Sequence, residues 1–276
     1  MKTCINIISS RTKCIKHCLD SLWENYNKEH DYTVFVYYFD DIYDSSILQS
    51  SIIGDSKQDT RFVNIEYKTP EFIAEDELYY NRDLWYVKNR FSKNRKGYLH
   101  MCHFTSNMYG YPNTELEEYD YIITHDDEAG YSRPMTQNPV EILSKTEYKI
   151  GAYFVGQRLK DGHPHQGHRD TRVGLWDFTK SFIMDNSVTP KSELLKSLLD
   201  NGKAEDFYHY LKWCDTYVIK TGVFRSDLWK KWIAAVNDSG GIYKYRWGDN
   251  EIITLFAYMI QDKVFNFNLV SDGTHV

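Results

Sequence analysis

Short apolar segments that alternate with a helical pattern constrain the fold of this sequence more than any other feature. Residues 4–10 and 32–41 are apolar and rich in β-branched and aromatic side chains, as buried strands are. Between them, residues 13–26 repeat apolar side chains near the 3.6-residue period of a helix, and residues 61–68 alternate as a further strand. A strand, a helix and two more strands in this order predict a parallel sheet with helical crossovers.

The rest of the chain continues this alternation without an interruption that would mark a second domain. We expect strands at residues 119–124, 149–157, 216–219 and 264–270, and helices at residues 75–109 (broken near 94–97), 175–184, 226–236 and 249–260. No internal repeat and no long Pro-, Gly- or Ser-rich linker separates these segments. The sequence therefore predicts one α/β domain.

Charge and composition exclude several classes of function. The 276 residues contain 33 Lys and Arg against 39 Asp and Glu, a formal net charge of −6, and no basic tract, which argues against nucleic acid as a partner. No apolar run approaches the ~20 residues that span a bilayer, and the first residues form no signal peptide, so we expect no transmembrane segment. Five cysteines without a CxxC pair suit a reducing compartment. These features predict a cytoplasmic protein.

The predicted strand 119–124 runs into His125 and then three consecutive acidic residues, Asp126, Asp127 and Glu128. In open α/β sheets, ligands bind at the carboxyl ends of the strands. Carboxylate oxygens are hard ligands, and two of them emerging from one strand can hold a divalent cation with positions left for phosphate oxygens. The sequence thus predicts a metal site here, with a solvated acidic turn as the alternative.

A second cluster of polar and aromatic residues, Y-R-W-G-D-N-E at 245–251, precedes the last predicted helix. Asp249 is placed to cap that helix. A carboxylate beside Arg246 and Trp247 is equally suited to accept a hydrogen bond or a proton from a sugar hydroxyl. The histidines at 163–168 fit no common zinc spacing, so we interpret that segment as a loop.

Four stretches of this sequence resemble, in order and near-matching spacing, the fungal Golgi α-1,2-mannosyltransferases of glycosyltransferase family 15. They are Y-L-H-M-C-H-F at 98–104, Y-D followed by D-D-E between 119 and 128, G-L-W with F-I between 174 and 183, and F-R-S, G-G-I-Y and R-W-G-D between 224 and 249. A closing G-T-H at 273–275 also resembles the family. The resemblance covers about residues 98–275.

The resemblance implies a GT-A type fold with a mixed central sheet flanked by helices, in one domain over residues 1–276. Residues 1–128 would bind the nucleotide sugar and residues 129–276 the acceptor. It further implies a metal-dependent transferase that moves a hexose, with mannose from GDP-mannose favoured, to a glycan hydroxyl. Manganese is the implied cofactor, with magnesium as the alternative. The absence of the family's membrane anchor suggests a bacterial or viral type of cytoplasmic enzyme.

The resemblance assigns Asp126 and His275 to the metal, Tyr98 to the reacting sugar and Arg11 to the nucleotide, and the chemistry of the remaining residues suggests the other roles. The metal ligands would be Asp126, Glu128 and His275. The catalytic group would comprise Asp249, Tyr217, Asp215 and Tyr98, and the substrate-binding group Arg11, Arg246, Trp247 and Glu251.

One departure from the family leaves the reaction type open. Tyr217 stands where the family has the glutamate that is its candidate nucleophile, and a phenol needs activation to act as one. The transfer would then be retaining without a fixed nucleophile, or inverting with Asp249, Asp215 or Glu251 as the general base. Alternatives are a donor such as a UDP-sugar, a non-catalytic lectin-like module, and a metal-dependent hydrolase.

Overall fold

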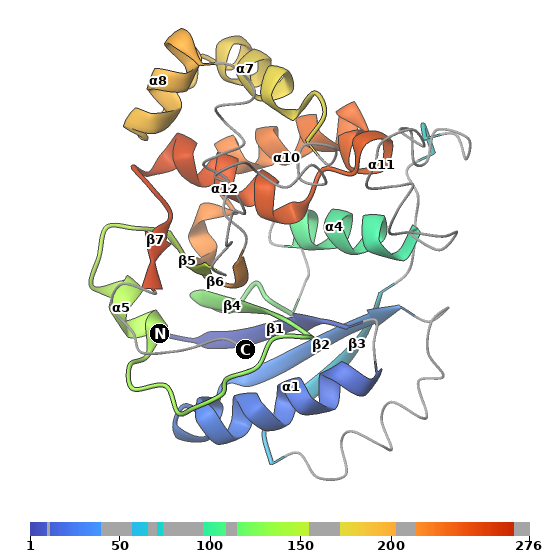
Figure 1. Cartoon of the computed structure of the whole chain (residues 1–276), viewed down its shortest axis with the longest axis vertical. Helices are drawn as coiled ribbons and strands as arrows, with labels where there is room; N and C mark the ends of the chain where they lie inside the picture. The colour runs from blue at the N-terminus through green and yellow to red at the C-terminus, as the bar shows by residue number, and fades with distance from the viewer. Residues whose placement is uncertain are drawn as a thin grey trace, which may run out of the picture.

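The computed structural model is built on a seven-stranded mixed sheet with helices on both faces (Figure 1). It describes residues 1–9, 12–39, 57–65, 71–73, 96–108, 115–154, 172–202 and 214–267. The strands are β1 (Thr3–Ile8), β2 (Thr33–Phe39), β3 (Thr60–Ile65), β4 (Tyr121–Asp126), β5 (Ile150–Phe154), β6 (Cys214–Lys220) and β7 (Phe265–Asn266). The helices are α1 (Thr12–Asn25), α4 (Lys96–Met108), α5 (Pro139–Ser144), α7 (Leu175–Asp185), α8 (Glu193–Asn201), α10 (Asp227–Ser239), α11 (Gly241–Tyr245) and α12 (Asp249–Ile260), with short 3₁₀ turns η1 (Asn27–Glu29) and η5 (Thr221–Val223).

The strand order, β3-β2-β1-β4-β6-β5-β7, places a change of direction in the middle of the sheet. Strands β1, β2 and β3 are parallel, as expected from the sequence, and β4 lies parallel to β1 on its other side. The chain thus leaves β1 toward one edge of the sheet and returns on the other side at β4. Ile8 pairs with Asp126, so both strands end at the same edge. Such a switch point is where open α/β sheets bind ligands.

Beyond β4 the sheet is mixed: β6 runs antiparallel to both β4 and β5, whereas β7 is parallel to β5. Thr124 and His125 of β4 pair with Tyr217 and Thr216 of β6. This register brings the beginning of β6 to the edge where β4 ends. The mixed sheet that the sequence resemblance implied is confirmed.

Two separate cores lie on the two faces of the sheet. In β2, Val34 and Val36 belong to the core that α1 covers, while Phe35 and Tyr37 belong to the core under α4, α10 and α12 (Figure 1). Since side chains of a strand alternate between the faces, a fully apolar strand is what two covered faces require.

The structure contains helices that the sequence pattern did not predict, among them α5 and α8. These two begin with a polar cap: Asn138 accepts from the amide of Val140 at α5, and Ser192 accepts from the amide of Leu195 at α8. The last predicted strand is shorter than expected, since only Phe265–Asn266 is a strand within the described residues. None of the helices in the described ranges combines the length and apolar composition needed to cross a bilayer.

Candidate active site

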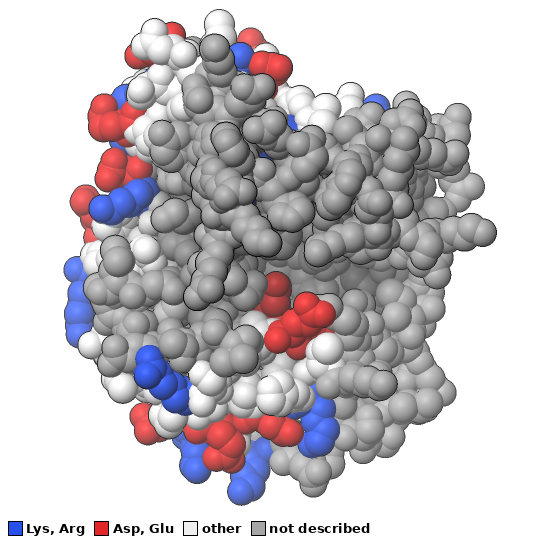
Figure 2. Space-filling model, viewed as in Figure 1, with Lys and Arg blue, Asp and Glu red and all other residues white. Residues whose placement is uncertain are grey.

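The acidic turn at the end of β4 exposes two carboxylates and buries the one between them. Asp126 and Glu128 are exposed, whereas Asp127 is 3% exposed. The Oδ2 atom of Asp127 accepts a hydrogen bond of 2.9 Å from Oγ of Ser9, which directly follows β1. This bond ties the ends of β1 and β4 together at the switch point. Figure 2 shows acidic side chains gathered at a hollow of the molecule, where Figure 1 places the carboxyl end of β4.

The chemistry of these two exposed side chains fits a hard divalent cation. Carboxylate oxygens are the ligands that magnesium and manganese prefer, and both side chains project from one short turn. Within the described residues, no group of three potential metal-ligating side chains forms. The third predicted ligand, His275, lies outside the described residues, as does Arg11.

A second group of predicted site residues comes together between α4, α11 and α12. The guanidinium carbon of Arg246 lies 4.4 Å from the centre of the Tyr98 ring, a cation–π contact. The electrostatic surroundings of Tyr98 also include Asp249 and Glu251. The structure therefore brings Tyr98 close to Arg246 and Asp249, although Tyr98 lies far from both of them in the sequence.

The backbone of Arg246 adopts a conformation that non-glycine residues rarely take. Its φ is 58° and ψ is 40°, in the left-handed region, at the end of α11. Glycine is the usual residue at such a helix end, and a side chain there costs about 1–2 kcal/mol. Strained backbone of this kind concentrates at functional sites. From this position the Arg246 side chain lies over the ring of Tyr98.

Asp249 has an electrostatic environment suited to proton exchange near neutral pH. Burial raises the pKa of its carboxyl from 3.8 to about 6, with a further contribution from the negative charge of Glu251. Backbone amides at the start of α12 and the thiol of Cys102 stabilise the ionised form and limit the rise. A carboxyl with a pKa close to the working pH is what a general base requires.

The start of α12 is seated on β6, at the same end of the sheet as the acidic turn. The hydroxyl of Tyr217 donates to the carbonyl oxygen of Asn250 at 3.2 Å, and the thiol of Cys214 donates to Oδ1 of Asn250 at 3.0 Å. Tyr217 pairs with Thr124, two residues before Asp126. The acidic turn and Asp249 thus border one region of the molecule.

Tyr217 itself is part of the core. It is 4% exposed, its hydroxyl also lies 3.2 Å from Oγ1 of Thr254, and burial raises its pKa well above the ordinary value. A phenol that stays protonated and donates to a carbonyl is a poor nucleophile. The geometry therefore favours a structural role for Tyr217 over the catalytic role predicted from the sequence. The backbone of Asp215 lies in β6, and its side chain is outside the described set.

Glu251, predicted to bind substrate, forms a buried ion pair instead. Its Oε1 accepts from Nη2 of Arg172 at 2.8 Å and from Nε of Arg172 at 2.9 Å. The Glu251 and Arg172 side chains are 5% and 2% exposed. This buried ion pair joins the start of α12 to the segment that contains Arg172.

Trp247, predicted to offer an apolar face to sugars, is 2% exposed. Its ring packs on Gly241, where a Cβ atom would lie 2.2 Å from Cε3 of the indole, and its Nε1 donates to the carbonyl of Val173 at 2.8 Å. The glycine of the G-G-I-Y stretch is thus needed for close packing against the tryptophan of R-W-G-D. Sequence reasoning missed this packing role, and it also missed Ser9, Cys102 and Arg172.

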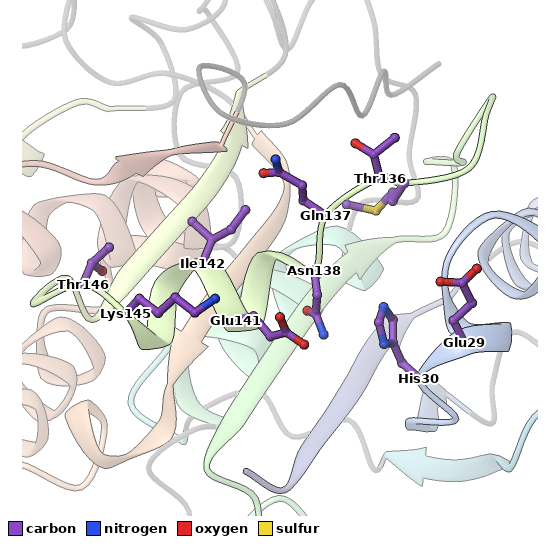
Figure 3. A pocket seen from close by; sticks show the side chains of 10 residues that line it. Glu29, His30, Thr136, Gln137, Asn138, Glu141, Ile142, Lys145 and Thr146 are labelled. Atoms are coloured by element: carbon purple, nitrogen blue, oxygen red, sulfur yellow. The ribbon is translucent and has the colours of Figure 1, made fainter.

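A pocket of about 620 Å³ lies elsewhere, between η1 and α5 (Figure 3). Glu29 and His30 line one side, and Glu141 and Lys145 line the other (Figure 3). Both elements precede the strands they lead into, β2 and β5, so this pocket sits at the amino ends of these strands. It is therefore separate from the acidic turn at the carboxyl end of β4.

Comparison with solved structures identifies the class of fold. The chain superposes on core-mannan synthase A from Aspergillus fumigatus in its Mn/GDP form with a TM-score of 0.77, at 14% identity, over 100% of this chain and 74% of the other. It superposes on the mannosyltransferase Ktr4p from S. cerevisiae in complex with GDP with a TM-score of 0.70, at 17% identity, over 95% and 67%. The fold is that of the GT-A glycosyltransferases, as predicted.

Sequence comparison then gives the family. The profile of the glycolipid 2-alpha-mannosyltransferases matches residues 2–269, so the chain belongs to this family. It is 22% identical to the O-glycoside alpha-1,2-mannosyltransferase omh1 of Schizosaccharomyces pombe over 207 residues, 74% of this chain and 50% of that protein. It is 26% identical to the probable mannosyltransferase KTR3 of Saccharomyces cerevisiae over 170 residues, 60% of this chain and 39% of that protein.

The matched part of the chain spans at most about half the length of these curated relatives. The relatives are mannosyltransferases of fungi. The expectation of a cytoplasmic enzyme of bacterial or viral type is therefore wrong, whereas the family predicted from the four sequence stretches is confirmed.

Proposed function

We propose that this protein is a mannosyltransferase that moves mannose from GDP-mannose to a hydroxyl group of a glycan acceptor. The observation that carries the proposal is the exposed pair Asp126 and Glu128 at the switch point of a GT-A fold, in a chain that matches the family over residues 2–269. The mannosyltransferase names of its relatives support the sugar. The GDP and manganese of the similar solved structures support the donor and the ion.

Asp126 and Glu128 would hold a manganese ion, with magnesium as the alternative, and His275 is proposed as the third ligand. When bound, such an ion supplies Lewis-acid stabilisation of the charge that grows on the nucleotide diphosphate as the glycosidic bond breaks. Ser9 and Asp127 hold the turn that carries the two ligands, since their hydrogen bond of 2.9 Å joins it to β1. Arg11, two residues after Ser9, is proposed to contact the nucleotide.

Asp249 and Arg246 are proposed to orient the reacting sugars. The Asp249 carboxylate can accept a hydrogen bond or a proton from a sugar hydroxyl, and the Arg246 guanidinium can donate to neighbouring oxygens. Tyr98 fixes the Arg246 side chain by the contact of 4.4 Å. In this scheme residues 1–128 bind mainly the donor and residues 129–276 mainly the acceptor.

The buried state of Tyr217 supports a reaction without a tyrosine nucleophile. Two routes then fit: a retaining transfer without a fixed nucleophile on the protein, and an inverting transfer with Asp249 as general base. Asp215 is the alternative general base that we propose for the inverting route. The anomeric configuration of the product, read by NMR, distinguishes the two routes.

The test is donor hydrolysis and transfer by the purified protein with a panel of GDP- and UDP-sugars, with manganese present or chelated. We expect metal-dependent release of GDP from GDP-mannose, and loss of at least ~100-fold in Asp126→Ala. Glu118→Ala, which removes an exposed carboxylate before β4, serves as the matched control and should keep full activity. Normal metal-dependent turnover in Asp126→Ala would overturn the metal site.

A lectin-like glycan-binding module is the second function that an observation favours, because Tyr217 occupies the position where the family resemblance implies a nucleophile. Such a module would bind glycans without nucleotide sugar or metal. Calorimetry with GDP and manganese separates the two: binding of GDP that depends on manganese supports the transferase, and glycan binding with no GDP binding supports the module.

A further inference from the structure

Residues 172–173, which lie far away in the sequence, contact the turn that carries Arg246 and Asp249. Arg172 forms the buried ion pair with Glu251, and the adjacent Val173 accepts the indole hydrogen bond of Trp247. Contacts of 2.8 Å therefore join residues 172–173 to both sides of Asp249. These contacts fix where the turn lies relative to α7, which begins at Leu175.

Gly248 allows the Glu251 carboxylate to fold back over the start of α12. A Cβ atom at Gly248 would lie 2.3 Å from Oε2 of Glu251, closer than a side chain can approach without displacing that carboxylate. The carboxylate is thus enclosed between the backbone of Gly248 and the guanidinium of Arg172. Asp249 stands between Gly248 and Glu251 in the chain, so this enclosed charge pair is its immediate neighbour.

We propose that Arg172 is a positioning residue for Asp249: it clamps the R-W-G-D turn through Glu251 and neutralises the charge of Glu251 beside the Asp249 carboxylate. The inference rests on the proposed function, in which Asp249 meets the sugar substrate. Without the guanidinium, the Glu251 carboxylate would repel the ionised form of Asp249 at full strength.

Within the part of the chain that the structure describes, the other groups around Asp249 do not provide this neutralisation. Among the described residues, the titratable groups that influence Asp249 or are influenced by it are Glu251 on α12, Tyr98 and Cys102 on α4, and Tyr217 on β6. Arg246, at the end of α11, acts on the same Tyr98 and Cys102. Tyr98, Cys102 and Tyr217 remain neutral, because burial raises the pKa of each well above its ordinary value. Arg246 is engaged over the ring of Tyr98. Arg172 is the cation in direct contact with Glu251 among the described residues.

The test measures the pKa of Asp249 directly, by the ¹³C chemical shift of its carboxyl carbon in the purified protein, with Asp249→Asn to assign the signal. Arg172→Met should raise this pKa by about one pH unit, and Glu251→Gln should lower it by a similar amount. The double variant, which removes both charges, should return it close to the wild-type value. Lys196→Met, which breaks the exposed pair with Glu193 on α8, is the matched control and should leave it unchanged.

Opposite shifts in the two single variants support the positioning role, because a purely structural contact would lower stability in both without moving the pKa in opposite directions. Equal values in all variants, or a shift of the same sign in both, would overturn it. If Arg172→Met fails to fold, Glu251→Gln against the double variant still decides, since restoration of the pKa by loss of the guanidinium requires that Arg172 acts on Asp249. This readout needs no turnover, so it is independent of whether the transferase assay succeeds.

If the protein is active, the acid limb of the pH profile of kcat/KM should move in the same directions as the pKa of Asp249. The pKa of Asp249 could move in opposite directions in the two single variants while the acid limb of kcat/KM stays unchanged. That result would support the effect of Arg172 on Asp249 and refute the proposed role of Asp249 in transfer. The two failures are therefore distinguishable.

Discussion

Replacement of Asp249 by asparagine should stabilise the protein while it removes activity. In the folded protein the pKa of this carboxyl is raised from 3.8 to about 6. A tenfold change in proton affinity corresponds to about 1.36 kcal/mol, so the ionised carboxylate costs the fold about 3 kcal/mol at neutral pH. Asparagine keeps nearly the same shape and carries no charge. Because half-buried Asp249 retains some solvent contact, we expect a gain of about 1–3 kcal/mol in Asp249→Asn at pH 8.

The pH dependence of this gain follows from linkage. Since the folded pKa lies above the unfolded one, the native state binds more protons between about pH 4 and 6, and wild-type stability falls as pH rises through that window. Below about pH 4 the carboxyl becomes protonated in both states, so the difference between wild type and Asp249→Asn should vanish. Above about pH 6 it should reach a plateau.

Thermal unfolding followed by circular dichroism at pH 4 to 8 measures the effect. For a chain of this size, a gain of about 1–3 kcal/mol should raise Tm by about 2–10 °C at pH 8. Asp177→Asn, at an exposed carboxylate on α7, is the control and should change Tm little at any pH. An Asp249→Asn variant that is less stable than wild type at pH 8 would refute the reasoning, since it would show that the charge is net favourable.

Three further substitutions test the buried surroundings of the site. Glu251→Gln should cost about 3–5 kcal/mol in urea unfolding, because it leaves the guanidinium of Arg172 buried without its counter-charge; a loss under about 1 kcal/mol would contradict a buried pair. Gly241→Ala should cost about 1–3 kcal/mol in the same assay, since the added methyl meets the ring of Trp247, and full stability of this variant would argue against that contact. Tyr217→Phe should cost about 1 kcal/mol and keep transfer within a few-fold, whereas a loss of ~100-fold or more would restore Tyr217 as the nucleophile.

Local sequence determined the framework of this protein. Apolar strands and the helical period of residues 13–26 predicted β1, α1 and β2, because two covered faces require strands that are apolar throughout. The position of Asp126 at the end of a strand was equally readable, since the apolar run of β4 gives way to charged residues there. The order of four short stretches identified the family.

Tertiary structure alone decided which polar and aromatic residues of the two clusters face inward. Asp126 and Asp127 are the same residue type in adjacent positions, but only Asp127 is buried, where Ser9, the residue after β1, donates a hydrogen bond to it. Glu251 is enclosed by Arg172, and Trp247 packs on Gly241. A buried carboxylate is tolerated only where a partner satisfies it, and that partner comes from a segment whose distance in the sequence gives no local signal.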